Sequence, residues 1–262
     1  MTVYTDRIVA IIQARMGSSR LPGKVLKKVN GIPLLKYQFE RVKQSSFISE
    51  TVIATTVREK DGVIAEFCEQ NGISCFRGNE DDVLSRYHEC AKEYKVDVVV
   101  RLTADCPLID PQVIDDVVKI YMENNYDFVA NTAPPEGFTY PEGMDVEVFS
   151  FPLLERASRE TKKPSEREHV THYFWQNPKL FSTYRIDLDK DFSAYRLTVD
   201  YPEDLDVTKA VIYGLYPKNP LFTMQDMIEF LDINPGIKEK NSCFKPNAGW
   251  QSAYQKDKQA SL

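Results

Sequence analysis

The sequence predicts an α/β fold in which helices cover both faces of one mainly parallel sheet, a three-layer α/β/α architecture. Two observations support this prediction. Strand-like and helix-like segments alternate through the first two-thirds of the 262 residues. The strand-like runs are continuously apolar and β-branched, which is typical of parallel strands buried on both faces. Right-handed connections through helices then place such strands side by side. The length suits a single domain over residues 1–262.

The first two-thirds of the chain contains five expected strands and four expected helices. The strands lie at residues 8–12, 51–55, 73–76, 96–102 and 126–130. The helices lie at residues 33–45, 59–71, 80–94 and 111–124. Pro33 favours a helix start because the first helical residue needs no N–H donor. Gly72 favours the end of the second helix, since glycine readily adopts the backbone angles of a helix stop.

The pattern changes near residue 131, where a segment rich in proline and glycine separates short strand-like runs. We expect this segment to leave the main sheet. Helices follow at 152–160 and 165–175, then a strand at 181–186. The chain is expected to re-enter the sheet at 195–199 and to continue as a helix to about residue 213. We assign residues 131–190 to an inserted region, and residues 217–262 to a C-terminal helix and a tail whose last dozen residues fray.

Composition limits the classes of function. The net charge of -6 disfavours broad electrostatic binding of nucleic acid or of an anionic membrane. No apolar run is long enough to span a bilayer, and the first apolar stretch is too short for a signal sequence. Five cysteines form no C-x-x-C pair and no metal-type spacing, which favours reduced thiols. We therefore expect a cytoplasmic protein without nucleic-acid or membrane partners.

The segment after the first expected strand, residues 13–24 (QARMGSSRLPGK), is basic and rich in glycine and serine. We call it the basic loop. Ligands of open α/β sheets bind beyond the carboxyl ends of the strands. Arg15, Arg20 and Lys24 supply charge, while the glycines let backbone N–H groups approach an anion. This chemistry suits a diphosphate or triphosphate, although composition alone also permits a solvated surface loop. Five residues separate Gly17 from Gly23, which excludes a Walker A motif.

The basic loop, together with residues 31–35 (GIPLL), resembles the opening of the cytidylyltransferases that activate Kdo, neuraminic acid and related sugars, and in particular their SpsF-like branch. Similar blocks follow in order at residues 77–86, 101–110, 140–149, 167–171 and 197–205. The resemblance implies a GT-A-type nucleotide-diphospho-sugar transferase fold. It further implies Mg²⁺-dependent transfer of CMP from CTP to an acidic, nonulosonic-type sugar in surface polysaccharide biosynthesis, with release of pyrophosphate. A homodimer formed through residues 131–190 is expected on the same grounds.

Two aspartates, Asp105 and Asp200, each follow an expected strand. Spacing alone favours a helix N-cap for such residues, because a carboxylate there accepts free backbone N–H groups. Carboxylates at neighbouring strand ends also suit Mg²⁺, which commonly takes one or two of them. The resemblance matches both aspartates to metal ligands. With Arg15 and Lys24 they form the predicted catalytic set.

The resemblance and the loop chemistry together give a predicted nucleotide site, with Gln13 and Arg77 near the cytosine. The nucleotide-binding set is Gln13, Ala14, Arg15, Gly17, Ser18, Ser19, Arg20, Lys24, Arg77 and Asp82. A place at a helix N-terminus, where a carboxylate complements the helix dipole, is an equal alternative for Asp81 and Asp82. The predicted acceptor side is Tyr140, Asp145, Glu147, Glu168 and His169. A zinc site at His169 and His172 is a weaker hypothesis, because no third ligand is evident.

Two other functions are compatible with these patterns. A glycosyltransferase of the same fold would bind a nucleotide sugar rather than make one. Its metal could then be held by the acidic pair Asp81–Asp82 or by Asp187 and Asp189. The basic loop suits a free triphosphate better. A non-catalytic nucleotide-binding protein is the third possibility, and the presence of both aspartates with all the loop cations argues against it.

Overall fold

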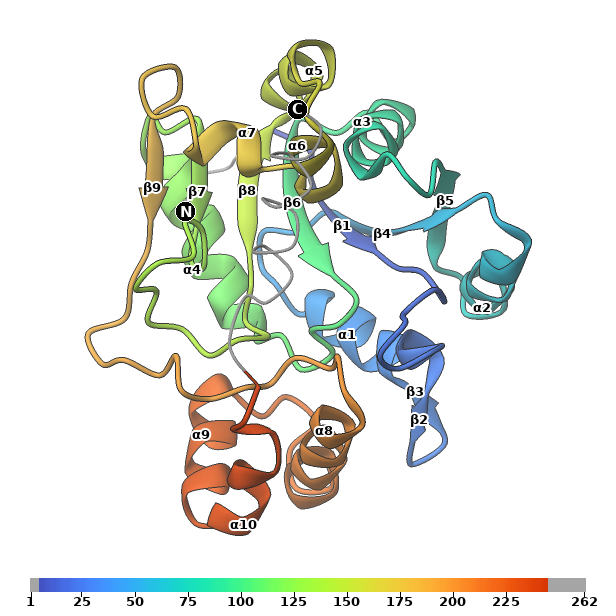
Figure 1. Cartoon of the computed structure of the whole chain (residues 1–262), viewed down its shortest axis with the longest axis vertical. Coiled ribbons are helices and arrows are strands. Elements are labelled where there is room, and N and C mark those ends of the chain that lie inside the picture. The colour runs from blue at the N-terminus through green and yellow to red at the C-terminus, as the bar shows by residue number, and fades with distance from the viewer. Residues whose placement is uncertain (1–4, 245–262) are drawn as a thin grey trace, which may run out of the picture.

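The structure, a computed structural model, describes residues 5–244. Within this range seven strands form one sheet in the order β5-β4-β1-β6-β8-β7-β9, and β2 and β3 form a separate hairpin. Figure 1 shows the sheet between its two helical layers. The strands are β1 (Ile8–Gln13), β2 (Lys28–Val29), β3 (Ile32–Pro33), β4 (Glu50–Thr56), β5 (Ser74–Gly78), β6 (Val98–Thr103), β7 (Phe128–Ala130), β8 (Glu147–Ser150) and β9 (Thr183–Arg185).

Helices connect these strands and cover the sheet. The α-helices are α1 (Leu34–Val42), α2 (Gly62–Gln70), α3 (Val83–Glu93), α4 (Pro111–Glu123), α5 (Phe151–Glu160), α6 (Pro164–His169), α7 (His172–Trp175), α8 (Pro202–Leu215), α9 (Met224–Asp232) and α10 (Pro235–Lys238). Three short 3-10 helices are η1 (Lys24–Leu26), η2 (Glu59–Asp61) and η3 (Glu239–Asn241). The polar last dozen residues of the predicted tail lie outside the described range.

Alternate residues of β1 point into two separate apolar layers, as the pleat of a strand requires. Ile8, Ala10 and Ile12 pack with apolar residues of α1, α2, α4, α8 and α9, whereas Val9 and Ile11 pack with those of α3 and α5. Both layers are buried, which explains the continuous apolar pattern of this strand. Strands β5, β4, β1 and β6 are parallel neighbours. The predicted three-layer α/β/α architecture with a mainly parallel sheet is confirmed.

The predicted excursion of residues 131–150 from the main sheet is wrong for its last part. Strand β8 lies inside the sheet, antiparallel to both β6 and β7. Its residues Val148 and Phe149 are fully buried. The last residues of the predicted excursion therefore add an apolar strand to the sheet. The proline- and glycine-rich pattern indicated the loop correctly but could not indicate where the chain returns.

The predicted return to the sheet at residues 195–199 is also wrong. This segment forms one isolated bridge, between Glu142 and Arg196. Its backbone N–H groups donate to loop carbonyls instead: Leu197 to Glu142 at 2.7 Å, and Val199 to Asp105 at 2.7 Å. The apolar residues of the segment are buried because they cover the edge of the core, and burial alone gave them the pattern of a strand.

The other predicted elements differ from the structure mainly at their ends. The helix expected at 80–94 begins at Val83, since Asp82 caps it by accepting from the backbone N–H of Ser85 at 2.9 Å. The helix expected at 165–175 is divided into α6 and α7 at Val170, whose φ of 56° is incompatible with a helix. No helix within residues 5–244 combines the length and apolarity that crossing a bilayer requires.

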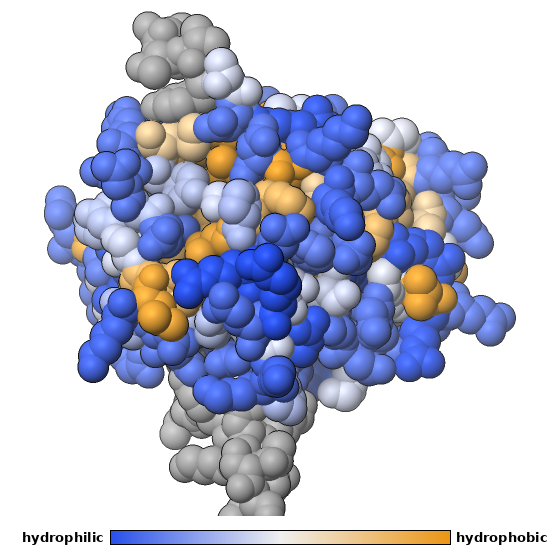
Figure 2. All heavy atoms as spheres, turned by 90° about the horizontal axis from the view of Figure 1, so that it is seen from above, coloured by the Kyte–Doolittle hydropathy of each residue, from blue (hydrophilic) through white to orange (hydrophobic). Residues whose placement is uncertain are grey.

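The face of the molecule shown in Figure 2 is mostly hydrophilic, with apolar atoms in small separate patches. The large apolar side chains exposed among residues 5–244 are spread from the end of β4 to the end of α9: Val57, Val63, Leu180, Tyr184, Tyr213, Leu221 and Ile233. Such scattered residues are ordinary on a protein surface.

Candidate active site

A cavity of about 600 Å³ opens at the carboxyl ends of β1 and β6, where Gln13 and Thr103 contribute to its wall. Most of the predicted nucleotide site lines this cavity. The predicted residues in its wall are Gln13, Ala14, Arg15, Gly17, Ser18, Ser19, Arg20, Lys24, Asp105, Glu168, His169 and Asp200. The fold thus brings the basic loop, both aspartates and two residues of the acceptor side to one cavity.

The basic loop is held in place by its own backbone and by one buried carboxylate. The carbonyl of Met16 accepts from the backbone N–H groups of Ser18 and Gly23, at 3.0 and 3.1 Å. Asp61, fully buried beside β4, accepts from the N–H of Met16 at 2.6 Å. Gly23 has a φ of 66°, a left-handed conformation that glycine adopts without strain. Hydrogen bonds within the loop and one contact from Asp61 therefore fix the loop conformation.

Lys24 lies between the two predicted metal ligands. Its Nζ is 2.7 Å from Oδ1 of Asp200 and 3.5 Å from Oδ2 of Asp105, and it donates to the carbonyl of Val199 at 2.8 Å. Burial by itself lowers the pKa of Lys24, but the two carboxylates outweigh it and the pKa is raised. Burial likewise opposes ionisation of Asp105, yet the Lys24 ammonium and the Thr103 hydroxyl keep the pKa of Asp105 below its usual value.

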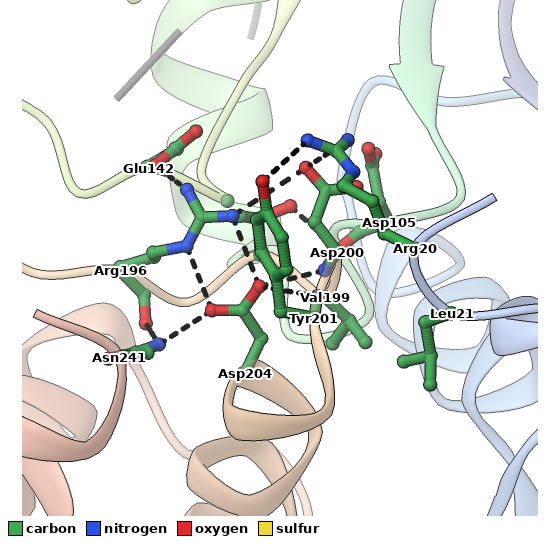
Figure 3. A network of polar contacts seen from close by, with 12 residues as sticks. Arg20, Leu21, Asp105, Glu142, Arg196, Val199, Asp200, Tyr201, Asp204 and Asn241 are labelled. Atoms are coloured by element: carbon green, nitrogen blue, oxygen red, sulfur yellow. Dashed lines mark hydrogen bonds and ion pairs between the residues drawn. The ribbon is translucent and has the colours of Figure 1, made fainter. Parts of the chain in front are cut away.

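The position of Asp200 depends on a buried network, shown in Figure 3. Asp204, which is fully buried, accepts from the backbone N–H groups of Asp200 and Tyr201, each at 2.9 Å. The guanidinium of Arg196 donates to both oxygens of Asp204, at 2.8 and 3.1 Å, and also pairs with Glu142. The network fixes the start of α8 and so orients the carboxylate of Asp200 toward the cavity.

Arg20 extends the same cluster at the rim of the cavity. Its Nη2 lies 2.9 Å from Oδ2 of Asp200, and its Nη1 donates to the hydroxyl of Tyr201 at 3.3 Å. The ring of Tyr201 stacks on Phe244, with ring centroids 3.9 Å apart and planes 2° apart. Asp200 therefore contacts two cations of the basic loop, Lys24 and Arg20.

Asp105 and Asp200 do not cap the helices that follow them, although their positions in the sequence favoured a capping role. Asp110, not Asp105, caps α4 by accepting from Gln112 at 2.9 Å, and Asp204 serves the first turn of α8. Within residues 5–244 no cluster of three or more His, Cys, Asp or Glu side chains forms a metal-binding group. Two carboxylates that already share one cation still fit Mg²⁺, because this ion usually completes its shell with water and phosphate oxygens.

Arg77 and Asp82 lie outside the cavity wall. The guanidinium of Arg77 donates to the carbonyls of Thr56 and Arg58, at 3.0 and 2.9 Å. Asp82 caps α3 and pairs with Arg167, whose Nη2 is 2.6 Å away. Both side chains are thus occupied by contacts within the protein, and Asp82 lies at a helix N-terminus, as the structural alternative required.

Three residues of the predicted acceptor side do not line the cavity: Tyr140 and Glu147, which are buried, and Asp145, which is half-buried. Glu147 pairs with Arg101 and accepts from the hydroxyl of Thr171 at 2.9 Å. Burial raises the pKa of Asp145, which accepts from the backbone N–H of Gly143 at 2.8 Å.

The other two residues of the predicted acceptor side, Glu168 and His169, line the cavity, and the ring of His169 stacks on that of His172 with centroids 4.6 Å apart.

Sequence reasoning missed Arg86, which lines the cavity from α3. A signal was present. Arg86 falls among the residues that form the buried face of α3, Val83, Leu84, Tyr87, Cys90 and Ala91. An arginine on the apolar face of a helix is unusual, since a buried charge is costly unless it is paired or bound.

Comparison with known proteins identifies relatives over most of the chain. Residues 9–228 match the family described as Cytidylyltransferase. The spore coat polysaccharide biosynthesis protein SpsF of Bacillus subtilis is 35% identical over 87% of this chain and 95% of its own length. A solved cytidylyltransferase from Leptospira borgpetersenii is 36% identical, with a TM-score of 0.85 over 92% of this chain and 100% of that one.

A solved CMP:2-keto-3-deoxy-manno-octonic acid synthetase complexed with CTP is 18% identical, with a TM-score of 0.61 over 79% of this chain and 99% of that one. At this identity the likeness shows a shared fold.

Proposed function

The chain belongs to the cytidylyltransferase family, and from this premise we propose that it transfers CMP from CTP to the hydroxyl of an acidic sugar of the nonulosonic type, with release of pyrophosphate. The observation that carries the proposal is the convergence of the basic loop with Asp105 and Asp200 on one point of the cavity. Two loop cations, Lys24 and Arg20, contact the carboxylate of Asp200 there, at 2.7 and 2.9 Å.

In the proposed reaction an acceptor hydroxyl oxygen attacks the α-phosphorus of CTP. A new oxygen–phosphorus bond forms, the bond to the β-phosphate oxygen breaks, and the hydroxyl proton is released. Little covalent chemistry is required of the protein, so positioning and charge stabilisation provide the rate. Lys24 and Arg20 neutralise the charge that develops on the phosphates. The loop N–H groups and serine hydroxyls donate to phosphate oxygens.

The proposed cofactor is Mg²⁺, held by the carboxylates of Asp105 and Asp200. When bound, such an ion polarises the phosphate and offsets charge on the leaving pyrophosphate. The proposal is supported by the position of both carboxylates in the cavity wall and by the network that holds Asp200. Asp204 accepts from the backbone N–H of Asp200 at 2.9 Å. This bond fixes the backbone of Asp200, the proposed metal ligand, and does not involve the Asp200 carboxylate.

The proposed substrate class and pathway follow from the relatives. The similarity to a protein named for spore coat polysaccharide biosynthesis supports a role in the assembly of a surface glycan. Glu168 and His169, which line the same cavity as Asp105, are the proposed contacts for the acceptor. A homodimer through residues 131–190 and a cytoplasmic location are part of the same proposal.

Pyrophosphate release tests the function. The protein is incubated with CTP, Mg²⁺ and a panel of ulosonic acids, and we expect at least one acid to give CTP-dependent pyrophosphate and a CMP-linked product. Asp105→Ala and Asp200→Ala should each lower kcat by about 100-fold or more, the scale of losing one group that stabilises transition-state charge. Asp206→Asn serves as the control, because Asp206 is half exposed on α8 and pairs with Lys209 away from the cavity.

Full Mg²⁺-dependent pyrophosphate release by both alanine variants would contradict the metal assignment. Cleavage of a CMP-sugar with transfer of the sugar, in place of pyrophosphate release from CTP, would identify a glycosyltransferase instead. Circular dichroism and a melting curve on each variant separate loss of chemistry from loss of folding.

A further inference from the structure

Arg86 is a buried guanidinium that reaches the cavity. Only 3% of its surface is exposed, and it lines the cavity from α3. Its Nη1 donates to the carbonyl of Asn79 at 2.6 Å, while its buried Nε has no hydrogen-bond partner within residues 5–244. The aliphatic stem packs so closely on Gly78 that an added Cβ there would lie 3.0 Å from Cγ of Arg86. The side chain is therefore fixed in place, and its guanidinium has N–H groups that no acceptor of the described residues uses.

The cations of the cavity fall into two pairs. Lys24 and Arg20 each form an ion pair with Asp200. Arg15 and Arg86 form no ion pair with any carboxylate of the described residues, although both line the same cavity. A buried cation such as Arg86 is costly without an anionic partner, and an anionic ligand in the cavity would lower that cost.

The two carboxylates that act electrostatically on Arg86 are already engaged elsewhere. Glu80 accepts from Arg58 and Lys60, each at 2.7 Å. Asp61 accepts from the backbone N–H of Met16 at 2.6 Å and from a threonine hydroxyl. Burial lowers the pKa of Arg86 most, while Tyr87, Asp61 and Glu80 raise it. Because neither carboxylate forms an ion pair with Arg86 among residues 5–244, its charge has no anionic partner there.

Arg15 adds to this uncompensated charge. The side chain of Arg15 is exposed at the start of the basic loop, and its repulsion is one of the causes that lower the pKa of Arg86. Two guanidinium groups that repel each other across a cavity are both stabilised by an anion placed between them. A neutral nucleobase would not remove the repulsion, whereas a phosphate accepts hydrogen bonds from both forks.

We propose that Arg15 and Arg86 form a second anion subsite of the cavity, which binds the terminal phosphates of the nucleoside triphosphate. Lys24 and Arg20, beside Asp105 and Asp200, serve the phosphate at which reaction occurs. This proposal rests on the proposed function for the identity of the nucleotide. Arg86 acts as a binding residue that distinguishes a triphosphate from a monophosphate.

Calorimetric titration with CTP, CMP and inorganic pyrophosphate tests the subsite. The titrations contain EDTA, so that the outcome does not depend on the role of Mg²⁺. We expect Arg86→Met to weaken binding of CTP and pyrophosphate by about 10- to 100-fold, as for loss of charged hydrogen bonds, and to change CMP binding less than twofold. Arg86→Lys keeps the charge and should recover part of the loss.

Two further variants keep the test decisive. Arg15→Met alters an exposed residue, which leaves the core intact, and it should give the same selective loss for CTP. Arg156→Met is the charge-matched control, because Arg156 is partly exposed on α5 and pairs with Glu160 outside the cavity wall. It should leave all three affinities unchanged.

Two results would overturn the proposal: equal weakening of CTP and CMP in the Arg86 and Arg15 variants, which would place both residues at the nucleoside, or unchanged binding of CTP. A wild-type protein that binds pyrophosphate selectively but turns over no acceptor with CTP would refute the proposed function and leave the subsite standing.

Discussion

Replacing Asp204 by asparagine should destabilise the protein strongly, although the two side chains have nearly the same shape. The carboxylate of Asp204 is fully buried and accepts five hydrogen bonds. Oδ1 accepts from Arg196 and Asn241, and Oδ2 accepts from Arg196 and from the backbone N–H groups of Asp200 and Tyr201.

Asparagine keeps one acceptor oxygen and replaces the other by an NH₂ donor. In its better orientation the amide oxygen takes the place of Oδ2 and serves three donors. Its NH₂ group then faces Nε of Arg196 and Nδ2 of Asn241, so two buried donors lose their acceptor. Each unsatisfied group costs about 1–3 kcal/mol. Breaking the buried ion pair as a whole costs about 3–5 kcal/mol, and we expect a loss of this size.

Urea denaturation followed by circular dichroism measures the free energy of unfolding. For a chain of this length a loss of about 4 kcal/mol corresponds to a fall in Tm of about 10 °C. Asp206→Asn on the same helix is the matched control, since Asp206 is half exposed and its pair with Lys209 should contribute less than about 1 kcal/mol. The network would not stabilise the fold as argued if Asp204→Asn cost no more than this control.

Two further substitutions address the backbone and the pH dependence. Gly143→Ala should cost about 3 kcal/mol or more by urea denaturation, because φ is +103° and the new Cβ would lie 2.6 Å from backbone atoms of Leu197 and Thr198. Gly31→Ala, with a φ of +77° in open space, should cost only about 1 kcal/mol, and equal losses in the two variants would exclude the steric explanation. His172 is buried, and burial, with repulsion from His169 and Arg101, lowers its pKa from 6.5 to about 2. The unfolded chain therefore binds a proton below pH 6.5 that the folded chain does not, so this contribution to stability is complete above pH 6.5 and falls by about 2 kcal/mol at pH 5. His172→Phe should remove that fall from the pH profile of the unfolding free energy, and an unchanged profile would show that other groups cause it.

Much of the fold could be predicted because its signals are local. The strand at 8–12 is apolar at every position because helices cover both faces of β1. The helix at 111–124 was found almost to the residue, since Pro111 and Asp110 mark its start. The segment 195–199 misled the same reasoning, because a buried extended chain and a strand share one pattern, and only the positions of Glu142 and Asp105 show which it is.

The candidate site could likewise be predicted only in part from the sequence. Glycine, serine and three cations at residues 13–24 were enough to indicate an anion-binding loop, because the chemistry of such a loop lies in its composition. The two arginines at 77 and 86 could not be separated by composition. Arg77 is occupied by backbone carbonyls, and Arg86 reaches the cavity.

The sequence by itself determined the α/β class, most helices and strands, and the chemistry of the basic loop, since each depends on neighbours along the chain. Only the tertiary structure decided which side chains meet. Lys24 lies against carboxylates 81 and 176 residues away, and β8, within the predicted inserted region, lies inside the sheet between β6 and β7. Such contacts are selected by the packing of the whole core, because close packing leaves each buried charge few positions in which a partner can reach it.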